Sequence, residues 1–124
     1  MVAISIVMKI KGKVLQGQGK GQYYVQKCLP ELEAALGFTC HPGTLNIDIG
    51  KALRLPKTKK IVVTFKDSAP VDCYLVKIKD LFDGAIVVPQ KTTHGKEIIE
   101  LVAPVNLRER LYLKDGDEVE CELV

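Results

Sequence analysis

The feature of this sequence that most constrains its fold is the recurrence of short segments in which every second residue is apolar. Successive side chains of a β-strand point to opposite faces of the sheet, so a period of two is typical of a strand with one buried face. Such segments occupy residues 4–10, 61–65, 74–78 and 119–123. In the last one, Glu118, Glu120 and Glu122 hold the alternate positions and are expected to face solvent.

Two further segments are apolar at consecutive positions. They read GAIVVP from Gly84 and EIIELVAP from Glu97. A strand that is apolar on both faces must be covered on both faces, so we expect these segments to lie deeper in the sheet than the alternating strands.

Two short segments are predicted to be helical. LPELEAALG has Pro30 in its first turn and Gly37 as its stop, and its leucines share one stripe at positions Leu29, Leu32 and Leu36. NLRERLYL has Asn106 as a candidate N-cap. Many short strands, two short helices and polar loops predict a mainly β fold, a small β-barrel.

The length and composition indicate one ordinary globular domain. A chain of 124 residues can bury a single core, and 47% hydrophobic with 27% charged residues is unexceptional. The net charge of +3 is spread along the chain, which favours an anionic ligand without requiring nucleic acid. No apolar run approaches the roughly 20 residues that cross a bilayer, and the first residues lack a basic leader and a cleavage site. We therefore expect a cytoplasmic protein with no membrane partner.

The four cysteines, Cys28, Cys40, Cys73 and Cys121, are far apart in the sequence and form no C-x-x-C pair. This spacing argues against a zinc site or a thioredoxin-like centre. We expect reduced cysteines in the core.

The segment LQGQGKGQYYV, residues 15–25, alternates glycine with polar residues. Such glycines permit positive φ and remove the Cβ atoms that keep a ligand away from backbone N–H groups, which suits phosphate. The segment is not a P-loop, because Gln18 stands where that motif requires lysine, and its glycine spacing differs from the dinucleotide fingerprint. A turn between two strands and a phosphate-binding loop both remain open on these residues alone.

Oxygen-bearing side chains alternate in HPGTLNIDIG, where Thr44, Asn46 and Asp48 share one face of a predicted strand. Magnesium accepts such ligands and usually takes few of them from the protein. The solvated outer face of a strand would give the same pattern.

Residues 89–96 form a polar, turn-rich connection of the kind in which binding groups concentrate. In the strand that follows, Glu100 shares its face with Ile98 and Val102, and a carboxylate between apolar neighbours is costly unless something satisfies it. The alternative is an exposed glutamate beside surface aliphatic residues. His94 could act as a general base, but a single histidine in a lysine-containing loop is more typical of a surface residue.

Taken together, GQGKGQYY, HPGTLNID and DGAIVVPQKTTHGKEIIELVAPVNLRERLYLKDGD resemble the archaeal CTP-dependent riboflavin kinases. The motifs occur in the order and near the spacing of that family, from the first strand to the last. The resemblance implies a cradle-loop β-barrel that transfers the γ-phosphate of CTP to the 5′-hydroxyl of riboflavin with magnesium, giving FMN and CDP. It implies a single domain over residues 1–124 without the N-terminal winged-helix domain of some members. We expect a monomer that binds these small molecules and no nucleic acid.

The resemblance also implies the site residues. Those of the nucleotide site are Gln18, Gly19, Lys20, Gly21, Gln22 and Tyr23, together with Val105, Asn106, Leu107 and Arg108. Those of the metal site are Thr44 and Asn46. Thr92 and Glu100 would contact the flavin, and Glu100 would orient or deprotonate the reacting hydroxyl.

Residues 107–124, LRERLYLKDGDEVECELV, are also similar to the swapped-hairpin DNA-binding regulators of the AbrB type. This likeness fits a structural unit of short helix, turn and strand better than a nucleic-acid surface. A DNA-binding regulator is therefore one alternative function, and a flavin- or nucleotide-binding module without catalysis is another.

Overall fold

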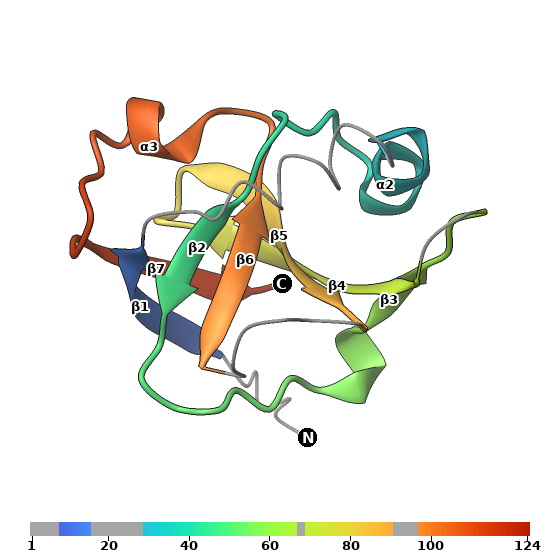
Figure 1. Ribbon diagram of the computed structural model, residues 1–124, viewed down its shortest axis with the longest axis horizontal. Coiled ribbons are helices and arrows are strands. Elements are labelled where there is room, and N and C mark those ends of the chain that lie inside the picture. The colour runs from blue at the N-terminus through green and yellow to red at the C-terminus, as the bar shows by residue number, and fades with distance from the viewer. Residues whose placement is uncertain (1–7, 16–28, 67–68, 91–96) are drawn as a thin grey trace, which may run out of the picture.

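The computed structural model describes residues 8–15, 29–66, 69–90 and 97–124, and Figure 1 shows how their elements are arranged. The strands are β1 (Lys9–Leu15), β2 (Leu45–Asp48), β3 (Ile61–Val63), β4 (Val71–Ile78), β5 (Phe82–Pro89), β6 (Ile98–Val102) and β7 (Glu118–Leu123). The helices are α2 (Leu29–Leu36), α3 (Leu107–Arg110) and the 3₁₀ turn η1 (Lys57–Lys59).

The strands close into a barrel through antiparallel pairings alone. Their order is β3-β4-β5-β6-β2-β1-β7, and the end of β7 returns to pair with β4. The strands from β4 to β7 in this order therefore form a closed ring of six, while β3 pairs with the first residues of β4 outside the ring. The small, mainly β barrel that the strand pattern predicts is confirmed.

Of the two hydrophobic clusters formed by the described residues, the larger fills the barrel interior. Alternate residues of each strand point into this interior. On β7, Val119 and Cys121 are buried while Glu118 is exposed, as the alternation predicts. The same alternation on the other strands fills the interior with Ile10, Val14, Leu45, Ile47, Val76, Ile78, Ile99 and Leu101. Of the strand predicted over residues 4–10, only the last part can be compared, because residues 1–7 lie outside the described ranges.

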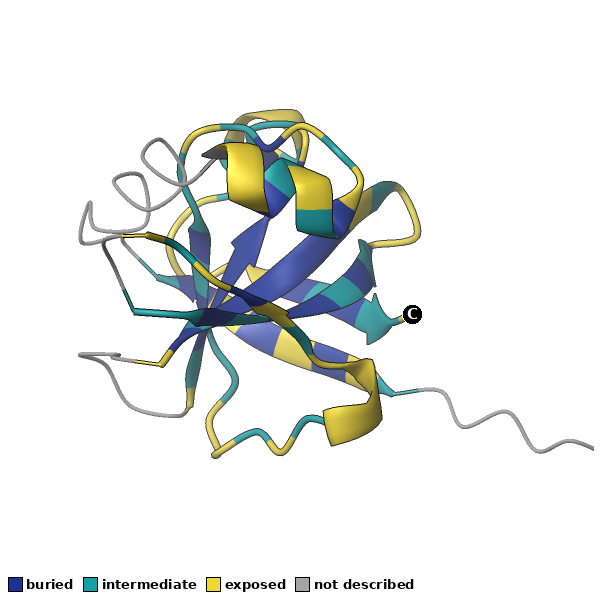
Figure 2. Cartoon of the chain, turned by 90° about the vertical axis from the view of Figure 1, so that its right-hand side faces the viewer, coloured by how far each residue is buried: buried dark blue, intermediate teal, exposed yellow. Residues whose placement is uncertain are grey.

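The second cluster lies on the outside of the barrel, under α2. Leu32 and Leu36 pack there with Val63, Val71, Cys73, Val87 and Val102 from β3 to β6. Figure 2 shows the exposed side of α2 in yellow over dark blue, buried strands. This layer covers Ala85, Val87 and Val102 on the outer face. Residues 84–87 and 99–102 are buried at every position, which confirms the prediction for the two apolar strands.

Local signals place both helices. Helix α2 ends at Leu36, directly before the predicted stop, and Asn106 caps α3 by accepting a hydrogen bond from the Glu109 backbone N–H at 3.2 Å. The strand predicted over residues 61–65 ends earlier, at Val63. It ends there because Val63 pairs with Val71, the first residue of β4, so nothing continues the ladder.

Cys40, Cys73 and Cys121 are buried and unpaired, as predicted, and Cys28 lies outside the described residues. Burial raises the pKa of the Cys73 and Cys121 thiols from 9.0 to about 12 and that of Cys40 to about 11. None of the described helices is long and apolar enough to span a membrane.

Candidate functional site

Three polar side chains meet on the outer face of the β2–β6 pair, and we call Thr44, Asn46 and Glu100 the polar cluster. Asn46 lies directly opposite Glu100 in the ladder between the two strands. Thr44 comes immediately before β2, and its Oγ1 donates a hydrogen bond to Glu100 Oε1 at 3.2 Å. Since the neighbouring residues of both strands fill the barrel interior, the pleat directs the cluster to the outer face.

The polar cluster is not a solvated surface. Glu100 is only 6% exposed, so the alternative of an exposed glutamate is wrong. Asn46 Oδ1 is buried and has no hydrogen-bond partner among the residues that the structure describes. A buried polar atom left unpaired costs about 1–3 kcal/mol of folding free energy, which makes Asn46 Oδ1 a candidate ligand-binding atom.

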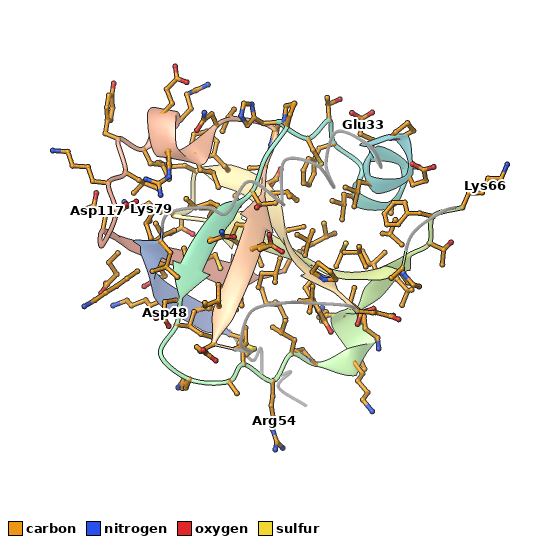
Figure 3. The ribbon with its side chains drawn as sticks, in the orientation of Figure 1. Glu33, Asp48, Arg54, Lys66, Lys79 and Asp117 are labelled. Atoms are coloured by element: carbon orange, nitrogen blue, oxygen red, sulfur yellow. The ribbon has the colours of Figure 1, made fainter. Side chains whose placement is uncertain are left out.

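Asp48, the third oxygen-bearing residue of the segment, is not part of the polar cluster and instead stabilises a turn. Its Oδ1 accepts a hydrogen bond from the Gly50 backbone N–H at 2.8 Å, which stabilises the turn after β2. Figure 3 labels Asp48 at the end of β2 that lies away from α3. The alternation therefore combines two cluster residues with one turn residue.

A pocket of about 180 Å³ opens next to the polar cluster, at the end of the barrel that carries α3. Its walls come mainly from residues 41–45, before and at the start of β2, and residues 105–108, at the start of α3. Thr44 belongs to both the pocket wall and the polar cluster, so the two form one continuous site.

The backbone of residues 41–44 is held in a specific conformation. His41 N–H donates to the Ala103 carbonyl at 2.8 Å, which ties the segment to the end of β6. Gly43 has a φ of 120°, a conformation that residues with a Cβ rarely adopt, and a Cβ there would meet nothing within 4 Å. Glycine is thus required at this position by the backbone angle rather than by a lack of space.

Arg108 connects the pocket wall to two other parts of the chain. Its Nη2 donates to the Leu15 carbonyl at 2.8 Å and to Asp115 Oδ1 at 2.7 Å. The α3 end of the pocket is therefore fastened to the end of β1 and to the turn before β7.

The structure brings together the predicted residues that it describes. Thr44, Asn46 and Glu100 make up the polar cluster, and Thr44 shares the pocket with the predicted nucleotide residues Val105–Arg108. The predicted residues Gln18, Gly19, Lys20, Gly21, Gln22, Tyr23 and Thr92 lie outside the described ranges, as does His94.

Sequence reasoning assigned no role to His41 or Asp115. The position of His41 just before the Pro-Gly-Thr segment could have suggested it as a wall residue. No local signal identifies Asp115, because its importance depends on where Arg108 lies in space.

The donor atoms of the polar cluster suit a hard cation. Within the described residues, no group of three or more histidine, cysteine, aspartate or glutamate side chains could hold a metal. A threonine hydroxyl and the unpaired Asn46 amide oxygen fit Mg²⁺, which usually takes one or two protein ligands and completes its shell with water and substrate phosphates.

Comparison with known proteins identifies the family. The family model for CTP-dependent riboflavin kinase, described as a domain of unknown function (DUF120), matches residues 14–123. The riboflavin kinases of Pyrococcus abyssi and Thermococcus kodakarensis are 39% and 42% identical to this chain, over 93% of the chain and 58% of each relative. The riboflavin kinase of Sulfurisphaera tokodaii is 35% identical over 94% of this chain and 96% of that protein. The chain thus spans little more than half the length of the first two relatives.

A closed ring of six antiparallel strands, with a pocket at one end and a polar cluster on the outer face, defines a small β-barrel protein with one candidate site. The family model covers most of the chain, and the chain covers nearly the whole Sulfurisphaera relative. The chain belongs to the CTP-dependent riboflavin kinase family.

Proposed function

We propose that this chain is a riboflavin kinase that transfers the γ-phosphate of CTP to the 5′-hydroxyl of riboflavin, giving FMN and CDP. One observation carries the proposal: the buried, unpaired Asn46 Oδ1 lies beside Glu100 and next to a pocket in a chain of this family. Phosphoryl transfer depends mainly on positioning and charge stabilisation, and this site offers groups for both.

The nucleotide would occupy the pocket between residues 41–45 and 105–108. Arg108 contributes a permanent positive charge at the pocket wall, which favours phosphate. Backbone groups of Val105–Arg108 are candidates for reading the amine, carbonyl and ring nitrogen of cytosine, which a purine cannot reproduce. Contacts of Gln18–Tyr23 with the nucleotide phosphates stay a prediction that rests on the family resemblance.

Thr44 and Asn46 would hold Mg²⁺, and the bound cation would supply neutralisation of phosphate charge. Because both side chains are neutral, they bind a cation weakly by themselves. We therefore expect the metal to bind together with the nucleotide, whose phosphates supply the negative ligands.

Glu100 would act on the flavin hydroxyl. The hydrogen bond from Thr44 and its place on a central strand fix the carboxylate before substrate binds. The carboxylate accepts a hydrogen bond from the 5′-hydroxyl and so orients the hydroxyl oxygen toward the γ-phosphorus. As the new O–P bond forms and the bond to the leaving CDP oxygen breaks, the hydroxyl proton can pass to Glu100.

The test is FMN formation by the purified chain with riboflavin, Mg²⁺ and either CTP or ATP. We expect FMN with CTP and much less with ATP. Salt-dependent binding to duplex DNA with no FMN under any nucleotide would favour the AbrB-like regulator. Binding of riboflavin or CTP without product would indicate a ligand-binding module.

A further inference from the structure

Arg108 lies at the pocket wall, and only part of its hydrogen-bonding capacity is used by the described residues. Its Nη2 donates to the Leu15 carbonyl and to Asp115 Oδ1. A guanidinium carries five N–H donors, and within the described residues no acceptor is bonded to those on Nε and Nη1. None of the described residues competes with a ligand for these donors, and a guanidinium group pairs well with phosphate.

The partner of Arg108 sits in a turn that is itself firmly held. Lys114 N–H donates to Asp117 Oδ2 at 2.7 Å, and Asp117 N–H donates to the Lys114 carbonyl at 3.0 Å. Gly116, with a φ of 89°, donates its N–H to the Val14 carbonyl at 2.7 Å, and Val14 N–H donates to the Asp117 carbonyl at 2.8 Å. Figure 3 labels Asp117 in this turn, beside the end of β1. Asp115 is thus carried on a rigid support.

We propose that Asp115 is a positioning residue for the nucleotide: it holds the Arg108 guanidinium in one orientation, so that its unused N–H groups are ready to bind the phosphates of CTP. The inference rests on the proposed function and adds a residue that does not itself touch the substrate. An arginine side chain loses conformational entropy when it binds a ligand. A fixed partner already restricts the side chain in the free protein, so less entropy is lost when the ligand binds.

An ion pair that serves only stability would behave differently. The side chains of Arg108 and Asp115 are 38% and 59% exposed, and exposed pairs of this kind contribute little to folding. The chain offers a matched comparison in Lys77 and Asp83, which lie 2.9 Å apart at 44% and 71% exposure and do not line the pocket. Loss of either ion pair should lower the free energy of unfolding by a similar small amount. Only loss of the Arg108–Asp115 pair should weaken CTP binding.

The test measures the Kd and KM for CTP with Mg²⁺, the Kd for riboflavin, kcat and thermal unfolding in the wild type, Asp115→Ala, Asp115→Asn and Asp83→Ala. We expect Asp115→Ala to weaken CTP binding and raise its KM by about tenfold, a typical effect of losing one useful hydrogen bond. The kcat and the riboflavin Kd should change less than about twofold. Asp115→Asn keeps an acceptor oxygen and should restore part of the affinity, while Asp83→Ala should bind CTP like the wild type.

A second arm removes Arg108 as well. If Asp115 acts through Arg108, then Asp115→Ala should have no further effect on CTP affinity in an Arg108→Ala background. Unchanged CTP affinity in both Asp115 variants would overturn the inference, and tighter binding would overturn it by revealing Asp115 as a competitor of phosphate. A wild type that neither binds CTP nor forms FMN would instead overturn the proposed function itself, and this inference with it.

Discussion

Two antiparallel strand pairs of this barrel carry polar side chains opposite one another, and their surroundings differ sharply. On β1 and β7, Lys11 lies opposite Glu120, with its Nζ 3.8 Å from that carboxylate and 3.6 Å from Glu118. These side chains are 39% to 63% exposed. On β2 and β6, Asn46 lies opposite Glu100, which is 6% exposed, and Asn46 Oδ1 is buried with no hydrogen-bond partner in the described part of the chain.

Polar side chains that stay hydrated, as in the Lys–Glu ladder, need no ligand to be stable in the fold. Polar side chains that are buried without a partner gain a hydrogen bond or a metal contact only when a ligand binds. The Lys–Glu ladder keeps its charges hydrated, so it costs the fold almost nothing and stabilises it little. The polar cluster lowers the stability of the fold, because an unpaired amide oxygen loses its hydration on burial. A site can therefore be recognised by the free energy that it costs rather than by the number of its polar residues.

The largest expected effect follows from removing the oxygen atoms of the polar cluster. Thr44→Val and Asn46→Leu should each lower the rate of FMN formation by about 100-fold or more, because each removes a predicted metal ligand. Asn46→Leu should leave the free energy of unfolding unchanged or raise it by about 1 kcal/mol, since it replaces an unpaired buried oxygen. The measurements are FMN formation at limiting Mg²⁺ and thermal unfolding. Wild-type rates in both variants would break the comparison, since the buried oxygens would then have no functional role.

Variants of Glu100 can distinguish two roles of its carboxylate, orienting the flavin hydroxyl and accepting the proton of that hydroxyl. Glu100→Gln keeps the shape and an acceptor oxygen, so we expect riboflavin affinity to be kept and kcat to fall by about tenfold, less than the loss of an essential base. Glu100→Ala should in addition raise the KM for riboflavin. Steady-state kinetics of both variants and of His94→Ala provide the check, with His94→Ala near the wild-type rate. An active Glu100→Ala variant together with an inactive His94→Ala variant would indicate that His94, and not Glu100, acts on the reacting hydroxyl.

The buried thiols provide a third kind of polar group, one that the fold accommodates by keeping it neutral. Burial raises the pKa of Cys73 and Cys121 from 9.0 to about 12. Between these values the unfolded chain loses a proton that the folded chain keeps, so stability is complete below pH 9 and falls as the pH rises toward 12. The slope is about 1.4 kcal/mol per pH unit for each thiol.

Denaturant unfolding of the wild type and Cys121→Ala from pH 8 to 11 measures this slope. The alanine variant should show a shallower loss of stability above pH 9, whatever its stability at neutral pH. Equal slopes in the two proteins would mean that the thiol ionises as readily in the fold as in the unfolded chain.

Most of the barrel could be predicted from the sequence because its strands obey a local rule. Alternation identified β4 and β7, and consecutive apolar residues identified β5 and β6, whose outer faces lie under α2. The return of β7 to pair with β4 had no local signal, because the register of Val76 opposite Leu123 depends on residues far apart in the chain. Periodicity therefore predicts a barrel but not which two strands pair to close it.

The same limit applies to the site. Alternation placed Thr44 and Asn46 on one face, and its apolar neighbours made Glu100 a candidate. The family resemblance gave these residues their roles and added Val105–Arg108. Alternation alone does not distinguish Asn46 on β2 from Lys11 on β1, since both lie between buried residues. Only the three-dimensional structure shows which outer face is covered and that Asp115 holds Arg108.

The smallest expected effect concerns the ladder, and it tests the other side of the comparison. Lys11→Gln, Glu120→Gln and the double variant should each change the free energy of unfolding by less than about 0.5 kcal/mol, because the charges are hydrated in both states. Their coupling energy in a double-mutant cycle should shrink further at 1 M salt, where screening is strong. FMN formation should match the wild type in all three. A coupling above about 1 kcal/mol that persists in salt, or a change in FMN formation, would mean that exposure does not separate the tolerated polar pairs of this barrel from the functional ones.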